Sequence, residues 1–247
     1  MYQTFLQNNM PQPLLPYTTS SFQIHQESSP IPLTFFTFQG KSVPCLWLPN
    51  ACHTLICNQT KNYLLDIPSI PSPKELTFEK NQSYFGITFF PGILPSNTLK
   101  TTPSLFQTLS AYPSFSDQIS HLLSSLTPNL HLILPPYPVE QTIDVIAASC
   151  GSFHSQELSK NLSYSERQIR RLFHAHMNYS PKTLSRILRF QSSLQELLKT
   201  PQKNNSEFID HLSYSDQAHF QREFKTFTTM TPRCLIHLLQ NLQSSDC

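Results

Sequence analysis

The chain has 247 residues, enough for two small domains with a hydrophobic core, and a formal net charge of +2. Its six cysteines follow no paired spacing, and its N-terminus lacks the basic start and long apolar run of a secretory signal. No apolar run approaches about 18 residues, the length that suggests a membrane helix. These features argue against a disulfide scaffold and a membrane protein, and they predict a soluble, cytoplasmic, reduced protein.

The first half of the sequence shows β-strand patterns. We expect residues 1–20 to be flexible and residues 21–133 to form a β-rich domain, because short runs of aromatic, Leu, Ile and Thr residues alternate with Pro, Ser and Asn. The expected strands are LTFFTFQ, CLWLP, HTLICNQ, NYLLDI, ELTFEK and YFGITFF, and a helix is expected near Ser114 to Leu126. Because 18 of the 21 prolines fall at or before Pro138, residues 134–142 are predicted to be a proline-rich boundary.

Beyond this boundary the apolar residues take the spacing of helices. Leu158 and Leu162 suit a first helix, and a buried stripe on a second helix is made by Ile169, Leu172, Phe173 and Met177. A longer third helix starts with Ser180 as N-cap and Pro181 at the first helical position, and its apolar residues are Leu184, Ile187, Leu188, Leu194, Leu197 and Leu198. The pattern then repeats with Phe208 and Leu212, with Phe220, Phe224 and Phe227, and with a last helix opening at Thr231 and Pro232. We therefore predict an all-α domain over residues 143–240, a tail over 241–247, and an α+β fold class.

The turn LSYS occurs twice in this helical part, 50 residues apart, at Leu162 to Ser165 and at Leu212 to Ser215. Each copy lies between a short helix and a second helix that opens on serine, in ELSKNLSYSERQIRRLF and EFIDHLSYSDQAHFQREF. In the first copy, Ser165 and Gln168 form an S-x-x-Q capping box that fixes where the second helix begins. The sequence therefore predicts two helix-turn-helix units, called the first unit and the second unit below.

Charge is distributed unevenly between the two halves. All seven arginines lie after residue 166, and the segment from Ser155 to Lys225 has 11 Lys and Arg against 7 Asp and Glu. From Met1 to Val139 the same counts are 5 and 5. A neutral half joined to an arginine-bearing half suggests that the second half meets a polyanion. A solvated basic face with no such partner is the alternative.

The segment from about Ser155 to Leu238 resembles the DNA-binding domain of the AraC/XylS family of bacterial transcription regulators. The family signature has the form G-Y/F-S-D-Q-x-H-F-x-R-x-F-K-x-x-x-G-M-T-P. This chain matches it at Tyr214, Ser215, Asp216, Gln217, His219, Phe220, Arg222, Phe224, Lys225, Met230, Thr231 and Pro232. Where the family usually has turn or cap glycines, the chain has Ser163, Asn178, Ser213 and Thr229. A residue other than glycine in a left-handed turn costs about 1 kcal/mol, and asparagine costs less.

The resemblance implies roles for the outward side chains of the two recognition helices. With Ile169, Leu172 and Phe173 inward, the side chains of Arg167, Gln168, Arg170 and Arg171 project outward, and the three arginines match base-facing positions of the family. In the second unit, Gln217, Ala218 and Arg222 are expected to face the groove. Arginine suits guanine and glutamine suits adenine. Phosphate contacts are expected from Ser165, Lys182, Ser215 and Lys225.

The first half resembles, over short stretches, a β-rich domain that precedes this DNA-binding domain in some members of the family. WLPNACHTLICN is similar to its Leu-Pro-Asp-Gly strand entry, with Asn50 and Ala51 at the Asp and Gly positions, and YFGITFFPGILP is similar to its G-x-x-F-x-P-G segment. Such domains imply effector sensing or self-association. The partners implied are double-stranded DNA, with RNA polymerase, a small-molecule effector and a second copy of the chain left open, and no membrane.

Two other functions are the alternatives to DNA reading. One is a small-molecule or metal sensor that acts mainly through the β-rich domain, with DNA binding weakened by the missing glycines. Cys45, Cys52, His53 and Cys57 invite a metal or thiol sensor in the β-rich half, but their spacing fits no standard zinc pattern and structural burial is the alternative. A helical protein-interaction module would show no salt-dependent affinity for DNA. No nucleophile elbow, Walker loop, Rossmann glycine set or paired-carboxylate cluster is present, so we expect no enzyme activity, no metal and no cofactor.

Overall fold

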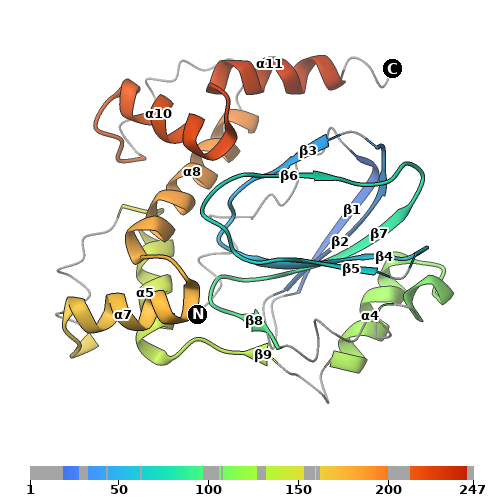
Figure 1. Cartoon of the computed structure of the whole chain (residues 1–247), viewed down its shortest axis with the longest axis horizontal. Coiled ribbons are helices and arrows are strands. Elements are labelled where there is room, and N and C mark those ends of the chain that lie inside the picture. Colours follow the sequence, from blue (N-terminus) through green and yellow to red (C-terminus); the bar gives the residue numbers. More distant parts are fainter. Residues whose placement is uncertain are drawn as a thin grey trace.

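The computed structural model describes most of the chain. The described residues are 19–27, 33–42, 44–61, 63–96, 106, 108–126, 132–152, 159, 162–199 and 212–243. They form a β-rich region followed by a helical region, the two parts that Figure 1 shows side by side. The α+β architecture predicted from the sequence is therefore confirmed.

The β-rich region is built around a five-stranded antiparallel sheet. The strands run in the order β1 (Thr19–Glu27), β2 (Leu33–Gly40), β7 (Ser83–Phe89), β4 (His53–Asn58) and β5 (Tyr63–Ile67). Two short pairs complete it: β3 (Pro44–Trp47) with β6 (Lys74–Thr77), and β8 (Leu94–Pro95) with β9 (Leu132–Ile133). The six predicted strands are confirmed as β2 to β7, whereas β1 begins at Thr19, inside the range expected to be flexible.

Both faces of the central strands are buried, which explains why these strands are nearly continuous apolar runs. On one face Phe36, Phe38 and Tyr84 pack with Trp47 of β3 and with Phe78, which directly follows β6. The register sets Gly86 opposite Phe36, and a Cβ atom on Gly86 would lie 2.0 Å from the Phe36 ring. Glycine at this position therefore makes room for the aromatic cluster.

The other face of the sheet belongs to a cluster that continues into the helices. It contains Phe35, Leu55, Phe85 and Ile87 of the sheet, together with Leu122 of helix α4 (Phe115–Leu126). A 3-10 turn, η2 (Thr108–Ala111), precedes that helix. The α4 helix was predicted at this place, and the Ser114 hydroxyl accepts a hydrogen bond from the Asp117 amide at its start. Sheet and helices thus share one apolar core.

Helix α5 (Tyr137–Ala148) lies where the sequence suggested a proline-rich boundary. Pro136 is its N-cap and Pro138 lies in its first turn, where a missing amide N–H breaks no helical hydrogen bond. Val139, Ile143, Ile146 and Ala147 of this helix are buried. The prolines therefore begin a helix here, and that helix packs against α7 (Glu166–Met177) and α8 (Pro181–Lys199).

The other helices of the described part are α10 (Gln217–Thr228) and α11 (Pro232–Gln243), and α8 runs between the two units (Figure 1). The apolar stripe predicted for α7 is confirmed at Ile169, Phe173 and Met177, and that predicted for α10 at Phe220, Phe224 and Phe227. Leu158 and Phe208, which were expected in the first helix of each unit, lie outside the described residues. Among the helices that the structure describes, none is long and apolar enough to cross a membrane.

Three side-chain hydrogen bonds join the β-rich region to the first unit and α8. His176 Nε2 donates to the Gly92 carbonyl at 2.6 Å, and Gln191 Nε2 donates to the Pro49 carbonyl at 2.6 Å. The Tyr179 hydroxyl lies 2.8 Å from the Ser69 hydroxyl. The first unit is thus attached directly to the β-rich region.

Candidate nucleic-acid interface

Helix α7 begins with the capping box that the sequence predicted. Ser165 Oγ accepts from the Gln168 amide at 3.3 Å, and Gln168 Oε1 accepts from the Ser165 amide at 2.9 Å. The reciprocal pair satisfies two amides that a helix start leaves without partners. It also turns the Gln168 side chain toward the helix end, so this residue fixes the start of α7 in addition to any contact outward.

The outer face of α7 carries the three arginines singled out from the sequence. Arg167, Arg170 and Arg171 are exposed, while Ile169 and Phe173 on the opposite face are buried. Among the described residues, none forms an ion pair with these three guanidinium groups. Each can therefore direct its fork of N–H donors to a partner outside the chain.

Helix α10 begins one residue later than expected. The sequence suggested that Ser215 opens the helix, but Asp216 is the N-cap, and its Oδ1 accepts from the His219 amide at 2.6 Å. That backbone hydrogen bond, and a second from the Ser215 hydroxyl, hold the pKa of Asp216 below its usual value. A carboxylate at a helix N-terminus also interacts favourably with the helix dipole. Asp216 therefore has a structural role at the turn.

The outer face of α10 presents the residues predicted to face DNA in the second unit. Gln217, Ala218 and Arg222 are exposed, and Phe220 and Phe224 behind them are fully buried. Lys225 is exposed near the C-terminal end of the same helix. The aromatic residues thus anchor a helix whose opposite side is free to meet a partner.

The four residues proposed for phosphate contact lie at the ends of these elements or on their surface. Ser165 and Ser215 precede α7 and α10, Lys182 lies in the first turn of α8, and all are exposed, as is Lys225. Ser165 Oγ is engaged with Gln168, and Ser215 Oγ donates to Asp216 Oδ2 at 3.1 Å. Hydroxyl oxygens retain further hydrogen-bonding capacity when they make such local contacts.

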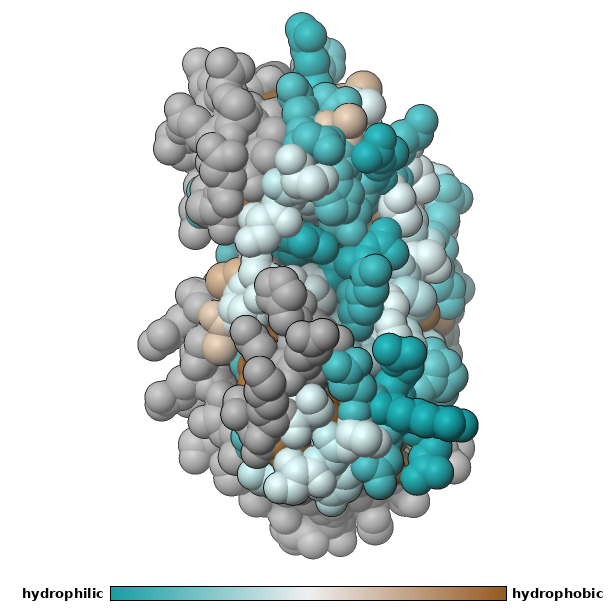
Figure 2. All heavy atoms as spheres, turned by 90° about the vertical axis from the view of Figure 1, so that its left-hand side faces the viewer, coloured by the Kyte–Doolittle hydropathy of each residue, from teal (hydrophilic) through white to brown (hydrophobic). Residues whose placement is uncertain are grey.

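Helices α7 and α10 lie toward the two ends of α8, on one side of the molecule (Figure 1). Figure 2 views the molecule from that side and shows hydrophilic residues extending along this face. Helix α8 has 19 residues, which corresponds to a length of about 28 Å. For comparison, successive major grooves on one face of DNA lie about 34 Å apart.

The four positions where glycine was expected all have a left-handed backbone. The φ angle is 55° at Ser163, 62° at Asn178, 56° at Ser213 and 64° at Thr229. Ala51, at the glycine position of the strand entry in the β-rich half, has a φ of 62°. The chain therefore keeps the backbone that favours glycine while carrying side chains there, and the predicted conformational cost falls on both units.

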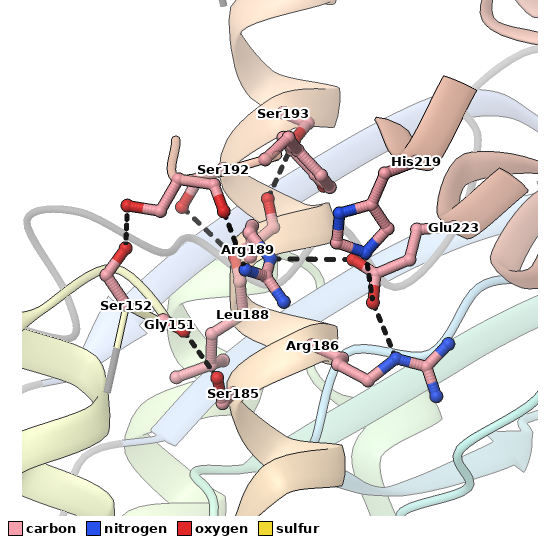
Figure 3. A network of polar contacts seen from close by, with 12 residues as sticks. Gly151, Ser152, Ser185, Arg186, Leu188, Arg189, Ser192, Ser193, His219 and Glu223 are labelled. Carbon is pink, nitrogen blue, oxygen red and sulfur yellow. Dashed lines mark hydrogen bonds and ion pairs between the residues drawn. The ribbon is translucent and has the colours of Figure 1, made fainter. Parts of the chain in front are cut away.

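Two arginines of α8 pair with an acidic side chain of α10, which was not predicted from the sequence. Figure 3 shows Arg186 and Arg189 directed toward Glu223 of α10. Arg186 Nε donates to Glu223 Oε1 at 2.5 Å, and Arg189 Nε lies 3.4 Å from Glu223 Oε2. The sequence did contain a sign of this pairing, because Glu223 stands among Phe220, Phe224 and Phe227. An acidic residue within such an apolar stripe needs a cationic partner. Part of the positive charge of the helical half is thus paired with Glu223 of the same chain.

The cysteines of the β-rich half are distributed over different environments. Cys45 packs in the cluster on one face of the sheet and Cys57 in the cluster on the other. His53 Nε2 contacts Asp66 Oδ1. Within the described residues, no three His, Cys, Asp or Glu side chains are grouped as metal ligands. Burial raises the pKa of Cys57 to about 11 and that of Cys52 well above its usual value, so burial favours the protonated form of both thiols.

The turn, the capped second helix and its exposed polar face define the class of this region as a helix-turn-helix DNA-binding domain. A family model described as a helix-turn-helix domain matches residues 158–236. This segment of the chain is a helix-turn-helix domain of the AraC type, the DNA-binding module of a family of transcription regulators.

Several solved structures share low similarity with the chain. The C-terminal domain of AraT, a response regulator from Geobacillus stearothermophilus, is 18% identical over 42% of this chain and 87% of its own, with a TM-score of 0.38. ToxT from Vibrio cholerae is 11% identical over 88% of this chain and 98% of its own, with a TM-score of 0.40. Wild-type ToxT with bound unsaturated fatty acid is 10% identical over 91% and 97%, with a TM-score of 0.41. No curated protein sequence matches it.

Proposed function

We propose that this protein is a sequence-specific DNA-binding transcription regulator that reads two successive major grooves with α7 and α10. The observation that carries the proposal is the pair of capped helices toward the two ends of α8, each anchored by a buried apolar face and presenting exposed arginine. Arg167, Arg170 and Arg171 read one groove, and Gln217 and Arg222 read the next, with Ala218 close to the bases.

These side chains distinguish the bases by the donor and acceptor pattern that each base edge presents in the groove. An arginine fork can donate to guanine O6 and N7, and a glutamine amide can pair with adenine, each worth about 1 to 3 kcal/mol of discrimination. Ser165, Lys182, Ser215 and Lys225 contact phosphates and set the position of the two helices on the duplex. Double-stranded DNA is the partner, and residues 143–240 with α5 form the part that binds it.

The test begins with selection of binding sites from a random duplex library by the full chain. Affinity for the selected site is then measured against salt concentration for wild type, Arg171→Ala and Arg222→Ala. Each phosphate neutralised adds about 0.9 to the slope of log affinity against log salt, so a slope of several units is expected. Each variant should lose about 1 to 3 kcal/mol at its own half-site.

A matched control removes one positive charge from the β-rich region, at the exposed residue Lys80. Lys80→Ala should leave both half-sites and the salt slope unchanged. If only Arg171→Ala changes affinity, the second unit holds DNA without reading bases. If no sequence is enriched, the proposed function is wrong.

A further inference from the structure

Glu223 is a buried carboxylate in the middle of the apolar face of α10. The residue is 4% exposed and is flanked on the helix by Phe220, Phe224 and Phe227, all nearly or fully buried. A buried charge is costly unless it is paired and hydrogen-bonded. Its retention at this position therefore points to a specific set of partners.

The partners of Glu223 come mainly from the linking helix α8. Arg186 Nε donates to Oε1 at 2.5 Å, and Arg189 Nε lies 3.4 Å from Oε2, so each carboxylate oxygen faces one guanidinium group. His219 Nε2, one turn earlier on α10, lies 3.9 Å from Oε1. Arg186 also lies over the Phe227 ring at 5.4 Å, and Arg189 over the Tyr214 ring at 5.1 Å. We call Glu223, Arg186 and Arg189 the Glu223 clamp.

The clamp continues into the turn of the second unit. Arg189 Nη1 donates to the Ser213 carbonyl at 3.1 Å, and the Ser213 hydroxyl accepts from Ser152, which follows α5. On the neighbouring turn of α8, the Ser185 hydroxyl donates to the Gly151 carbonyl (Figure 3). One polar network therefore connects the end of α5, the middle of α8, the turn before α10 and α10 itself.

We propose that the Glu223 clamp sets the spacing between the two DNA half-sites that this chain accepts. The inference rests on the proposed function. The exposed residues Gln217, Ala218 and Arg222 lie outside the buried stripe that contains Glu223, so the clamp touches no base and acts through the angle of the helix. Glu223 is a positioning residue, because its hydrogen bond from Arg186 and its ion pair with Arg189 define one orientation of α10 on α8 more narrowly than apolar contacts alone.

Half-site spacing is a sensitive readout of that orientation. Adding one base pair moves a half-site about 3.4 Å along the duplex and, with 10 to 10.5 base pairs per turn, rotates it by roughly 35°. A rigidly held α10 fits one spacing and loses its contacts at the others. A loosely held α10 adapts to several spacings at the expense of affinity for the best one.

The experiment uses the site selected by wild type and a series of duplexes in which the half-sites are moved by −1, +1 and +2 base pairs. A further duplex carries the first half-site alone. Wild type should bind the selected spacing roughly tenfold more tightly than the shifted spacings. A rigid link raises the effective concentration of the second unit only where its half-site lies at the matching distance. Glu223→Gln should reduce that preference to less than about threefold while binding the single first half-site as wild type does. Arg222→Ala, the matched control, should weaken the second half-site at every spacing.

An unchanged spacing preference in folded Glu223→Gln would overturn the inference. An equal loss on every duplex, including the first half-site alone, marks a general loss of folded protein, and the spacing series is then run on a second variant, in which an unchanged preference would likewise overturn it. If Glu223→Gln does not fold, Arg186→Met serves instead, since it keeps an apolar contact with Phe227 and leaves Arg189 to pair with Glu223. Failure of wild type to enrich any two-part site overturns the proposed function itself, and is thereby distinguished from failure of the clamp.

Discussion

The two units share the LSYS turn, but the rest of the molecule holds them in different ways. The first unit packs against α5 and α8, and His176 and Tyr179 bind it to the β-rich region. In the second unit, α10 and α11 pack on α8 and on each other, and the Glu223 clamp and the Ser193–Tyr214 hydroxyl pair are polar attachments to α8. A repeated sequence therefore does not confer equal rigidity, because anchorage depends on what each copy meets in the folded chain.

The difference in anchorage between the two units can be tested most strongly by substitutions in the apolar core of each unit. Phe173→Ala and Phe224→Ala each remove a ring that is 0% exposed, and each should cost about 3 to 5 kcal/mol of unfolding free energy. Native-state hydrogen exchange should show that Phe173→Ala also lowers protection of strands β4 and β7, because the first unit is bound to the β-rich region. Phe224→Ala should spare those strands, and equal loss in both variants would contradict the difference in anchorage.

The attachment of the first unit can be tested at Tyr179. Tyr179→Phe removes the hydrogen bond to Ser69 and should lower stability by about 1 kcal/mol. Chemical denaturation measures the change, and a double-mutant cycle with Ser69→Ala isolates the pair. Tyr164→Phe is the matched control, because the Tyr164 side chain is exposed in the LSYS turn of the first unit. It should change stability by less than about 0.5 kcal/mol. A cycle with no coupling energy would show that this contact does not join the regions.

The left-handed turns allow the units to be stabilised separately. Thr229→Gly relieves a β-branched residue at a φ of 64° and should raise stability by about 1 kcal/mol, seen as a higher melting temperature. Asn178→Gly is the matched change at a φ of 62° in the first unit, and it should gain less because asparagine tolerates this conformation. A larger gain at Asn178 than at Thr229 would contradict this account.

The smallest expected effect concerns Asp144 of α5, the helix that supports the first unit. Burial, together with the nearby charge of Glu140, raises the pKa of Asp144 from 3.8 to about 6. The folded state therefore binds this proton more tightly than the unfolded state, so ionisation destabilises the fold as pH rises from about 4 through about 6.

Asp144→Asn removes this cost. Its stability should exceed that of wild type above about pH 6 by less than about 1 kcal/mol, since the half-buried carboxyl is partly screened by solvent, and the difference should vanish below about pH 4. Urea denaturation across this pH range measures it, with Asp117→Asn on α4 as the exposed control. A difference that does not depend on pH would have another origin.

The sequence by itself determined the elements whose signals are local. Strand runs between prolines, the S-x-x-Q box at Ser165 and the start of α8 at Pro181 depend on neighbours within a few residues, and the structure has them where they were predicted. The stripe of Phe220, Phe224 and Phe227 showed which side of α10 is buried. Helix α5 was missed because its prolines suggested a boundary, although Val139, Ile143, Ile146 and Ala147 have helical spacing.

The pairing of Arg186 and Arg189 with Glu223 could be seen only in the tertiary structure. Arg186 and Arg189 are indistinguishable by residue type from Arg170 and Arg171, but packing of α8 against α10 brings the first pair to Glu223, 37 and 34 residues away in sequence. Likewise the contacts of His176 with Gly92 and of Gln191 with Pro49 join residues 84 and 142 positions apart. Burial and partners at such separations depend on the complete fold, because no local pattern encodes which distant group a side chain will meet.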